Sequence, residues 1–488
     1  MFFNSYIFIL LFIPLLLIGY FTLNHFKKYQ WATAYLTAMS LWFYGYYNLY
    51  FLGAFLVSIL GNYLLSKGLL KLKGQTRGAK CLLTVGIMLN AGYLFVCKYM
   101  GFFTETINDV FHTSFSFFKI AMPLGISFYT FQQIAYLVDS YRKETEENSL
   151  LEYTAFMSFF PQVIEGPIML HGEWIPKLRD VENRKVNYEN LLKGFYGFSL
   201  GLAKKVLIAD SLASVVTAGF GDISSNSATD AWVVMLCYTL QLYFDFSGYS
   251  DMALGLGTML NLEVPINFNS PYKAVSIGDF WDRWHMTLTR FFTKYIYIPL
   301  GGSRKGTLRT YGNVLLIFLI SGFWHGAAWN YVFWGCMNGI AMVLYRMGRK
   351  WYDKIPKLLR IMMTFLFQVF AWTMFRASSI KSGLAMMKKV FTASYVPLSS
   401  TLYKSFNGIF EIKVAEKLCI PIIGERMPEL FLLVVIVLLL FAVFFMKNTQ
   451  EKMKQYQPTV WKMLVAVFCL TWSLISLGNV TEFLYVNF

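Results

Sequence analysis

The stretch YGNVLLIFLISGFWHGAAWNYVFWGCMNGIAMVLY, residues 311–345, runs for 35 residues without one Asp, Glu, Lys or Arg. As one straight helix it would measure about 52 Å at 1.5 Å per residue, whereas the hydrocarbon core of a bilayer is about 30 Å thick. The glycines on either side of Trp324 and His325 offer a place for a break between Gly322 and Gly326. The first arm is then about 13 residues, or ~20 Å, long. We therefore expect a membrane protein in which His325 lies at the tip of a short helix, in a depression where the bilayer is thin.

The composition of the whole chain agrees with a membrane location. Hydrophobic residues make up 56% of the 488 residues and charged residues 14%, against about 25% charged residues in soluble proteins. The net charge is +16, but the basic residues lie in short links between apolar runs, as positive-inside bias places them. This distribution argues against a nucleic-acid partner and predicts membrane lipid as the surroundings.

Apolar runs and basic links together predict the topology. No Lys or Arg precedes the first apolar run, and Lys27 and Lys28 follow it, so we interpret residues 5–24 as a retained span with the amino terminus outside rather than as a signal peptide. The link 67–80 holds five basic residues and no acid, which marks it as cytoplasmic. Further spans are expected at residues 31–47, 50–66, 81–99, 120–140, 195–216, 230–251, 361–375, 430–446 and 463–477. With the broken run at 311–345, eleven or twelve spans are predicted.

Three stretches do not fit the pattern of simple spans. Residues 151–170 are apolar but are broken by Pro161, Gly166 and Pro167, and the next link is basic. We expect this stretch to be re-entrant or interfacial, with irregular backbone that lines an interior cavity. Residues 261–310 are polar, aromatic and basic and are placed at the inner face, and the external segment 376–429 is expected to hold amphipathic helices.

Two of the five histidines are candidate functional residues. His325 lies in SGFWHGAAWN, where a histidine inside an apolar run is costly enough to suggest a function. A buried imidazole is neutral at pH 7 and can accept a proton from a hydroxyl. The alternative is a histidine that only hydrogen-bonds one helix to another. His25, His112 and His171 fall in or beside links and are expected to be solvated or locally bonded.

His285 lies in DFWDRWHMTLTRFFTKYIYIPLGGSRKG, residues 279–306. Basic residues near the Gly301–Gly302 turn could hold the phosphate or pantetheine groups of a thioester donor. The alternative is an interfacial aromatic anchor with positive-inside charge.

Other chemistry-bearing residues fit structural roles. Asp245 and Asp251 lie at the cytoplasmic end of a predicted span, where acids pair with a neighbouring basic group or cap a helix more often than they catalyse. The six cysteines are widely spaced, so buried thiols are expected rather than disulfides or a zinc site. No motif indicates a metal, and no G-x-S-x-G elbow or P-loop is present.

Seven motifs in order resemble one family. They are PLGISFYTFQ (123–132), FFPQVIEGPI (159–168), GLAKKVLIAD (201–210), YFDFSGYSDMALGLG (243–257), FWDRWHMTLT (280–289), YIYIPLGGSRKG (295–306) and GFWHGAAWN (322–330). Together they resemble the bacterial membrane-bound O-acyltransferases (MBOAT), specifically the branch that O-acetylates alginate. Asp282 and Lys294 depart from the alginate-type pattern, which leaves the polymer open.

The resemblance implies an all-α, polytopic ring of helices with a central tunnel. It implies one integral-membrane acyltransferase domain over residues 1–488, with a core at about 120–376 flanked by helices in 1–119 and 377–488. Its invariant histidine corresponds to His325, and a second, usual in bacterial members, to His285. We expect His325 to act as general base, and His285, Trp281 and Trp284 to shape the inner half of the tunnel. Arg283 and Arg304 are expected near the donor, and Trp324 and Asn330 are further tunnel residues.

The implied reaction passes an acetyl group from a cytoplasmic thioester, acetyl-CoA in the first instance, through the membrane to an extracytoplasmic hydroxyl. No bound cofactor or metal is expected. The implied setting is the plasma membrane, and the implied partner is an extracytoplasmic SGNH or esterase-like acetyltransferase or the polysaccharide machinery. Alternatives are D-alanyl transfer to teichoic acid from a carrier protein, a transporter or flippase, and a scaffold for a soluble enzyme. The absence of two matching broken spans argues against a transporter.

Overall fold

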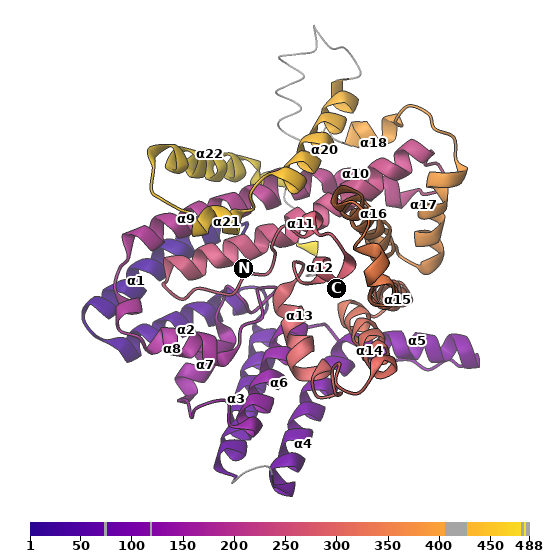
Figure 1. Cartoon of the computed structure of the whole chain (residues 1–488). Coiled ribbons are helices and arrows are strands. Elements are labelled where there is room, and N and C mark those ends of the chain that lie inside the picture. Colours follow the sequence, from indigo (N-terminus) through magenta and orange to yellow (C-terminus); the bar gives the residue numbers. More distant parts are fainter. Residues whose placement is uncertain (73–75, 118–119, 406–426, 480–482, 485–488) are drawn as a thin grey trace. The chain divides into compact units, whose positions relative to one another are not determined.

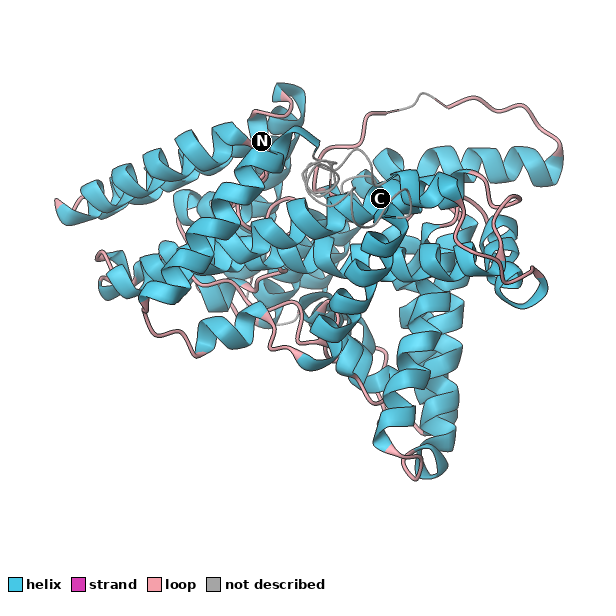
Figure 2. Ribbon diagram, turned by 90° about the horizontal axis from the view of Figure 1, so that it is seen from above, coloured by secondary structure: helices cyan, strands magenta, loops and turns pink. Residues whose placement is uncertain are grey.

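The computed structural model describes residues 1–72, 76–117, 120–405, 427–479 and 483–484. The regular elements of these residues are helices, and Figure 2 draws no strand among them. The prediction of an all-α chain is confirmed. The chain forms two compact units, one of Met1–Phe198, Met252–Ile266 and Pro458–Met463, the other of Ser199–Asp251, Asn267–Gln457 and Leu464–Phe488. The helices α9, α11 and α22 contribute residues to both.

The first unit holds the amino-terminal helices (Figure 1). They are η1 (Phe8–Phe12), α1 (Ile13–His25), α2 (Tyr29–Gly45), α3 (Leu49–Lys71), α4 (Arg77–Leu94), η2 (Phe95–Tyr99), α5 (Met100–Phe111), α6 (Ile126–Arg142), α7 (Leu150–Ser158), α8 (His171–Arg179), η3 (Glu182–Arg184) and the start of α9 (Tyr188–Ala203). The predicted span at 81–99 is the middle of one continuous helical run from α4 to α5, and the span at 120–140 begins only at Ile126.

Buried amides join α3, α4 and α6, which lie side by side in Figure 1. Asn62 and Asn90 exchange hydrogen bonds of 3.2 and 2.7 Å, and Asn62 also donates to Gln133 Oε1 at 3.0 Å. In lipid, such side-chain hydrogen bonds replace the hydrophobic effect as a force between helices.

The carboxyl ends of α3 and α6 lie together. Lys143, just past α6, donates from Nζ to the carbonyl oxygens of Leu69, Leu70 and Leu72 at 2.8–2.9 Å, where α3 leaves its last carbonyls without helical partners. Lys67 pairs with Glu147 at 3.0 Å. The two basic links after these helices therefore lie at one end of the unit, as the charge pattern predicts.

The backbone between α7 and α8 is irregular and buried. Residues 159–169 are all buried, and Gly166 N donates to Gln162 O at 3.1 Å to close a turn. A Cβ at Gly166 would lie 2.2 Å from Pro161 O, so only glycine fits. The predicted break in this apolar stretch is confirmed, and protein surrounds the irregular backbone as membrane depth requires.

The second unit holds the carboxyl-terminal helices. They are η4 (Lys204–Ala209), α10 (Asp210–Gly221), most of α11 (Ala228–Met259), η5 (Pro271–Lys273), α12 (Ile277–Trp281), α13 (Met286–Phe292), η6 (Thr293–Tyr297), α14 (Thr307–His325), α15 (Trp329–Tyr352), α16 (Lys357–Arg376), α17 (Ile380–Thr392), α18 (Ser400–Lys404), α20 (Met427–Phe445), α21 (Thr449–Lys454), the rest of α22 (Val460–Ser476) and η9 (Leu477–Asn479).

The predicted break in the long apolar run is confirmed. The helix α14 ends at His325, Gly326 and Ala328 are extended, and α15 begins at Trp329. The expected 13-residue arm is wrong, because α14 begins at Thr307 and has 19 residues, about 28 Å. The polar residues before Tyr311 continue the helix, since hydropathy marks lipid contact and not the helix end.

Five of the described helical runs are long and apolar enough to span a membrane: 8–25, 49–71, 77–111, 357–376 and 428–445. The shorter α22 is also apolar. The span count of eleven or twelve stays a prediction. The helix α17 buries Gly383, Met386 and Val390 on one face while Lys381 and Lys388 are exposed, as expected for an amphipathic helix. The rest of that external segment, 406–426, lies outside the described residues.

Candidate active site

The segment that carries His285 is held by a short backbone pairing. Asn269 N donates to Arg283 O at 2.9 Å, and Met286 N donates to Asn267 O at 3.0 Å. Between them, Ser276 caps the amino end of α12, and its Oγ accepts from Asp279 N at 3.1 Å. The chain then turns at His285, which adopts a left-handed conformation (φ 46°, ψ 50°) before α13. A non-glycine residue in this region is strained, and such residues cluster at functional sites.

His285 is enclosed, at 1% exposure. Its Nδ1 lies 3.0 Å from Asn267 Oδ1, and its ring packs edge-on against Phe246 with the centroids 4.8 Å apart. His285 lies outside the helical runs that are long and apolar enough to span a membrane. Burial lowers the pKa of its imidazole to about 3. The imidazole is therefore neutral near pH 7.

His325 lies at the carboxyl end of α14 and is 3% exposed. Its ring is edge-on to Trp324 at 4.8 Å, Trp334 at 5.2 Å and Phe375 at 5.3 Å. Aromatic side chains therefore pack around the ring, and the depression expected at this histidine stays a prediction.

Tryptophans connect the two histidines. The Trp324 ring lies 4.8 Å from His325 and 6.4 Å from His285, between centroids. On the other side, Trp334 lies 5.2 Å from His325 and 5.8 Å from Trp281. The structure thus brings both histidines to one aromatic cluster.

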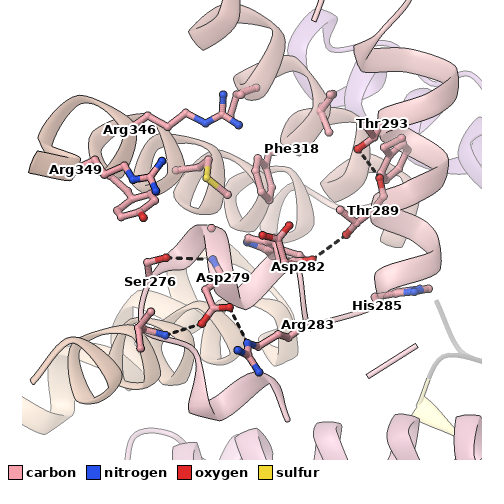
Figure 3. Close-up of a pocket in the computed structure, with 18 of the residues that line it drawn as sticks. Ser276, Asp279, Asp282, Arg283, His285, Thr289, Thr293, Phe318, Arg346 and Arg349 are labelled. Carbon is pink, nitrogen blue, oxygen red and sulfur yellow. Dashed lines mark hydrogen bonds and ion pairs between the residues drawn. The ribbon is translucent and has the colours of Figure 1, made fainter. Parts of the chain in front are cut away.

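A cavity of about 1340 Å³ opens beside this cluster (Figure 3). Of the residues proposed from sequence, His285, Trp281 and Arg283 line it. Ser321 and Phe318 of α14 form part of the wall one and two turns before His325, respectively, and His325 is itself outside the lining. The cavity therefore ends against the aromatic cluster.

The lining of the cavity holds more basic than acidic side chains. It contains Lys273, Arg283, Arg346, Arg349, Lys357 and Arg360 against the acids Asp279, Asp282 and Asp353. The acids are largely engaged: Asp279 pairs with Arg283 at 2.7 Å, and Asp353 with Arg360 at 3.0 Å and Arg349 at 3.4 Å. Figure 3 shows Arg346 and Arg349 extending from α15 on the side away from His285. Such a lining attracts an anion.

Asp282 is the acid within this lining with a perturbed pKa. Burial, and next the neighbouring Asp279 carboxylate, raise the pKa of Asp282, while Arg283 and Arg346 oppose the shift. Asp282, which departs from the alginate-type pattern, therefore lines the cavity.

The other residues proposed from sequence lie outside the cavity lining. Trp284 is buried between Phe280, Phe268 and Trp372, with centroids 4.8–5.6 Å apart, in the aromatic core. Arg304 lies in the exposed turn between Gly301 and Gly306. Asn330 donates from Nδ2 to Ala377 O at 2.8 Å, which ties α15 to the end of α16.

Sequence reasoning missed the basic residues of α15 and α16. Arg346, Arg349, Lys357 and Arg360 all lie beyond the last of the seven motifs, which ends at residue 330. The spacing of Arg346 and Arg349 by three residues, which puts them on one helix face, was the signal that could have found them.

The two span acids are paired, as expected, although with lysines of GLAKKVLIAD. Lys204 lies 2.6 Å from Asp251, and Lys205 lies 2.7 Å from Asp245 and 2.9 Å from Asp210. Leu484 N also donates to Asp245 Oδ2 at 3.0 Å. These carboxylates fix helices rather than face the cavity.

The structure agrees with some of the remaining expectations about side chains and differs from others. His25 and His112 are exposed as expected, but His171 is buried and lies 2.6 Å from Asn148 Nδ2. Five cysteines are free thiols, and Cys419 lies outside the described residues. Among the described residues no three His, Cys, Asp or Glu side chains gather as metal ligands do, and the absence of a metal stays a prediction.

The chain matches known proteins along most of its length. The model of the MBOAT, membrane-bound O-acyltransferase family, matches residues 3–387. The chain is 37% identical to the peptidoglycan O-acetyltransferase of Helicobacter pylori (strain ATCC 700392 / 26695), over 100% of this chain and 97% of that protein. It is 36% identical to the probable alginate O-acetylase AlgI of Azotobacter vinelandii, over 80% and 78%.

A more distant match is the teichoic acid D-alanyltransferase of Bacillus subtilis (strain 168), 28% identical over 52% of this chain and 68% of that protein. The family model covers the residues that hold the seven motifs, and the long apolar helices fit a membrane-bound family. The chain belongs to the membrane-bound O-acyltransferase family and is a multi-pass membrane acyltransferase.

Proposed function

We propose that this protein is an O-acetyltransferase of the plasma membrane. It takes an acetyl group from a thioester donor on the cytoplasmic side and passes it to a hydroxyl on the outside, for O-acetylation of an exported or cell-wall polysaccharide. The observation that carries the proposal is the basic cavity that ends at the aromatic cluster around the two histidines. The amino terminus is outside.

The charged residues that line the cavity support a phosphate-bearing thioester as the donor. Acyl-thioester carriers such as acetyl-CoA bear phosphates, which cannot enter a low-dielectric interior without a large penalty. The exposed Arg346, Arg349 and Lys357 at the outer part of the cavity match those phosphates, with arginine suited to bidentate contacts. The uncharged arm then extends along Trp281 and Phe318 toward His285.

His325 serves as general base in the proposed reaction. One ring nitrogen takes the proton from the acceptor hydroxyl while its oxygen attacks the thioester carbonyl carbon. The carbon–sulfur bond breaks, and the thiolate leaves and takes up the proton. The rings of Trp324 and Trp334 pack against His325, and in the proposed reaction a rotation of one of them opens a path for the thioester to the acceptor.

The acceptor side rests on the relatives. The proteins named for peptidoglycan and alginate O-acetylation match this chain over more of its length than the D-alanyltransferase does. This favours acetyl transfer to a polysaccharide, received directly or through an extracytoplasmic SGNH or esterase-like partner. D-alanyl transfer from a carrier protein is the second candidate.

The proposal is tested with inverted membrane vesicles that contain the protein and its envelope polymer, supplied with [14C]acetyl-CoA. We expect label in the polymer fraction, and a loss of about 10²- to 10⁴-fold in His325→Ala, the usual contribution of a positioned base. His25→Ala, at an exposed histidine of α1, is the matched control and keeps wild-type activity.

Three outcomes would overturn the proposal. Label that enters only from a D-alanylated carrier favours the second candidate. Unchanged acylation in His325→Ala indicates a scaffold for another enzyme. Solute uptake that depends on His325, without acylation, indicates a transporter.

A further inference from the structure

Asn267 contacts His285 and the two residues that follow it. It lies in the extended segment after α11 and is fully buried. Its Oδ1 is 3.0 Å from His285 Nδ1, 3.3 Å from Thr287 N and 3.0 Å from Thr287 Oγ1, and its backbone oxygen accepts from Met286 N at 3.0 Å. One asparagine thus contacts three consecutive residues at the turn before α13.

The backbone amide of Thr287 fixes the orientation of the Asn267 amide. A backbone N–H can only donate, so the atom that faces it must be the oxygen and not the nitrogen of the side chain. The same oxygen faces His285 Nδ1. Since an amide oxygen only accepts, Nδ1 must carry the proton, and in the neutral ring Nε2 is then the basic nitrogen.

The other half of this amide supports a functional role. Asn267 Nδ2 is buried and has no hydrogen-bond partner among the described residues. A buried donor without a partner is unfavourable by about 1–3 kcal/mol, so asparagine is a poor choice here for stability alone. The strained left-handed backbone of His285 points the same way.

We propose that Asn267 is a positioning residue that fixes His285 as the Nδ1-protonated tautomer, with Nε2 as the basic nitrogen at the inner end of the donor cavity. In that state His285 can accept a hydrogen bond from the pantetheine amide of the donor or a proton from the reacting groups. The inference rests on the proposed function for its catalytic consequence but not for the tautomer itself.

The first test compares Asn267→Leu and Asn267→Asp in the acetyl-CoA vesicle assay. Asn267→Leu removes the hydrogen-bond acceptor of His285 Nδ1, so we expect kcat to fall about ten- to hundredfold. This loss is part of the rate enhancement of about 10²- to 10⁴-fold that a positioned acid–base group contributes. The KM for acetyl-CoA should change less than about twofold, because the phosphate-binding residues are intact.

Asn267→Asp keeps an acceptor and adds a negative charge beside Nδ1. It should restore most of the kcat at high pH and move the acid limb of the rate profile up by about one to three units. The acidic, basic and histidine side chains on the surrounding elements are Asp279, Asp282, Arg283 and Arg290 near His285 in the sequence, Asp230, Asp245 and Asp251 on α11, and Arg309 and His325 on α14. None of these causes the shift in the wild type, where burial lowers the pKa of His285.

Asn338→Leu is the matched control. Asn338 is also fully buried, and its Nδ2 bonds only within α15, to Trp334 O at 3.0 Å. It should lower stability without moving the pH profile. An Asn267→Asp profile identical to the wild type, or an Asn267→Leu enzyme with normal kcat, overturns the inference.

A second measurement separates this inference from the proposed function. Nitrogen-15 NMR of the histidine-labelled full chain in detergent, with the His285 signal assigned from His285→Gln, reads the tautomer without any substrate. We expect a protonated Nδ1 in the wild type and a mixture of tautomers in Asn267→Leu. A protonated Nε2 in the wild type refutes the inference even if the acetylation assay succeeds, whereas a protonated Nδ1 with no acetylation refutes only the proposed function.

Discussion

Lys205 shows how a single residue can hold a membrane-embedded fold. Its ammonium is 1% exposed and shared by Asp210 and Asp245, and the Phe483 ring lies 4.5 Å from it. Removal of one partner from a buried ionic group leaves an uncompensated charge, which is far worse than the loss of a surface pair.

We predict that Lys205→Met destabilises the protein by about 3–5 kcal/mol, seen as a lower apparent melting temperature in detergent and a lower yield. Lys185→Met is the control, because Lys185 and Glu182 form a pair of similar length, 2.6 Å, at an exposed position. Such pairs contribute about 1 kcal/mol or less. Equal losses in the two variants would show that the buried group is not ionic.

At the residue scale, the sequence indicates that a side chain must be paired better than it indicates which residue pairs with it. The pairing of Asp245 and Asp251 follows from the penalty for charges at membrane depth, and it is confirmed. The burial of His171 does not follow, because its partner Asn148 is 23 positions away. Asn267 carries no signal at all, since a single asparagine in a polar segment has no periodicity.

The crossing of α14 and α15 depends on two glycines. A Cβ at Gly322 would lie 2.4 Å from Tyr331 O, and a Cβ at Gly335 would lie 2.4 Å from Phe318 O. Backbone atoms cannot move aside as a side chain can, so the helices would have to separate.

We expect Gly322→Ala and Gly335→Ala each to lower stability by about 1–3 kcal/mol through overpacking, and to reduce acylation because His325 ends the same helix. The controls are Gly312→Ala and Gly348→Ala on the same two helices, where an added Cβ meets nothing within 4 Å. These should be neutral or slightly stabilising, by up to about 1 kcal/mol. The apparent melting temperatures of the four variants, measured by thermal denaturation in one detergent, test this prediction.

The start of α7 gives a pH dependence. Glu152 closes a capping box with Ser149 and accepts from Arg179 Nε at 2.7 Å. The hydrogen bond from Arg179 is the main cause that lowers the pKa of Glu152 from 4.5 to about 2. A carboxyl with a lowered folded-state pKa stabilises the fold above its unfolded pKa, and that contribution disappears as the pH falls from about 4.5 to about 2.

The melting temperature of the wild type should therefore fall over this pH range more steeply than that of Glu152→Gln, which lacks the titrating group. Glu105→Gln, at an exposed glutamate of α5, is the control and should follow the wild type. Parallel curves for wild type and Glu152→Gln would contradict the prediction.

At the element scale, breaks were predictable and lengths were not. Glycine and proline identify the interruptions at 159–170 and after His325, because backbone sterics act locally. The start of α14 at Thr307 and the run of α11 to Met259 were missed. Polar residues continue both helices beyond the apolar stretch, where tertiary contacts decide the helix end.

For the whole molecule, the sequence predicts the class and the family but not the cavity. Composition alone requires lipid, and the contacts of Lys143 and Lys67 confirm that two basic links share one end of the first unit. The cavity brings α12, α13, α14, α15 and α16 together, and no local pattern in the sequence indicates which faces of these helices meet.

If the donor is a phosphate-bearing acyl thioester, as proposed, the basic residues that line the entrance of the cavity, Arg346 and Arg349 among them, have a consequence for turnover. An acetyl group is uncharged, so a carrier that has given it up keeps every phosphate that the entrance attracted. The spent carrier is then held nearly as tightly as the loaded one, and it competes with the next delivery. Its departure, rather than bond exchange, would set the pace of the enzyme, and acetylation in the cell would follow the ratio of loaded to unloaded carrier instead of the amount of either one.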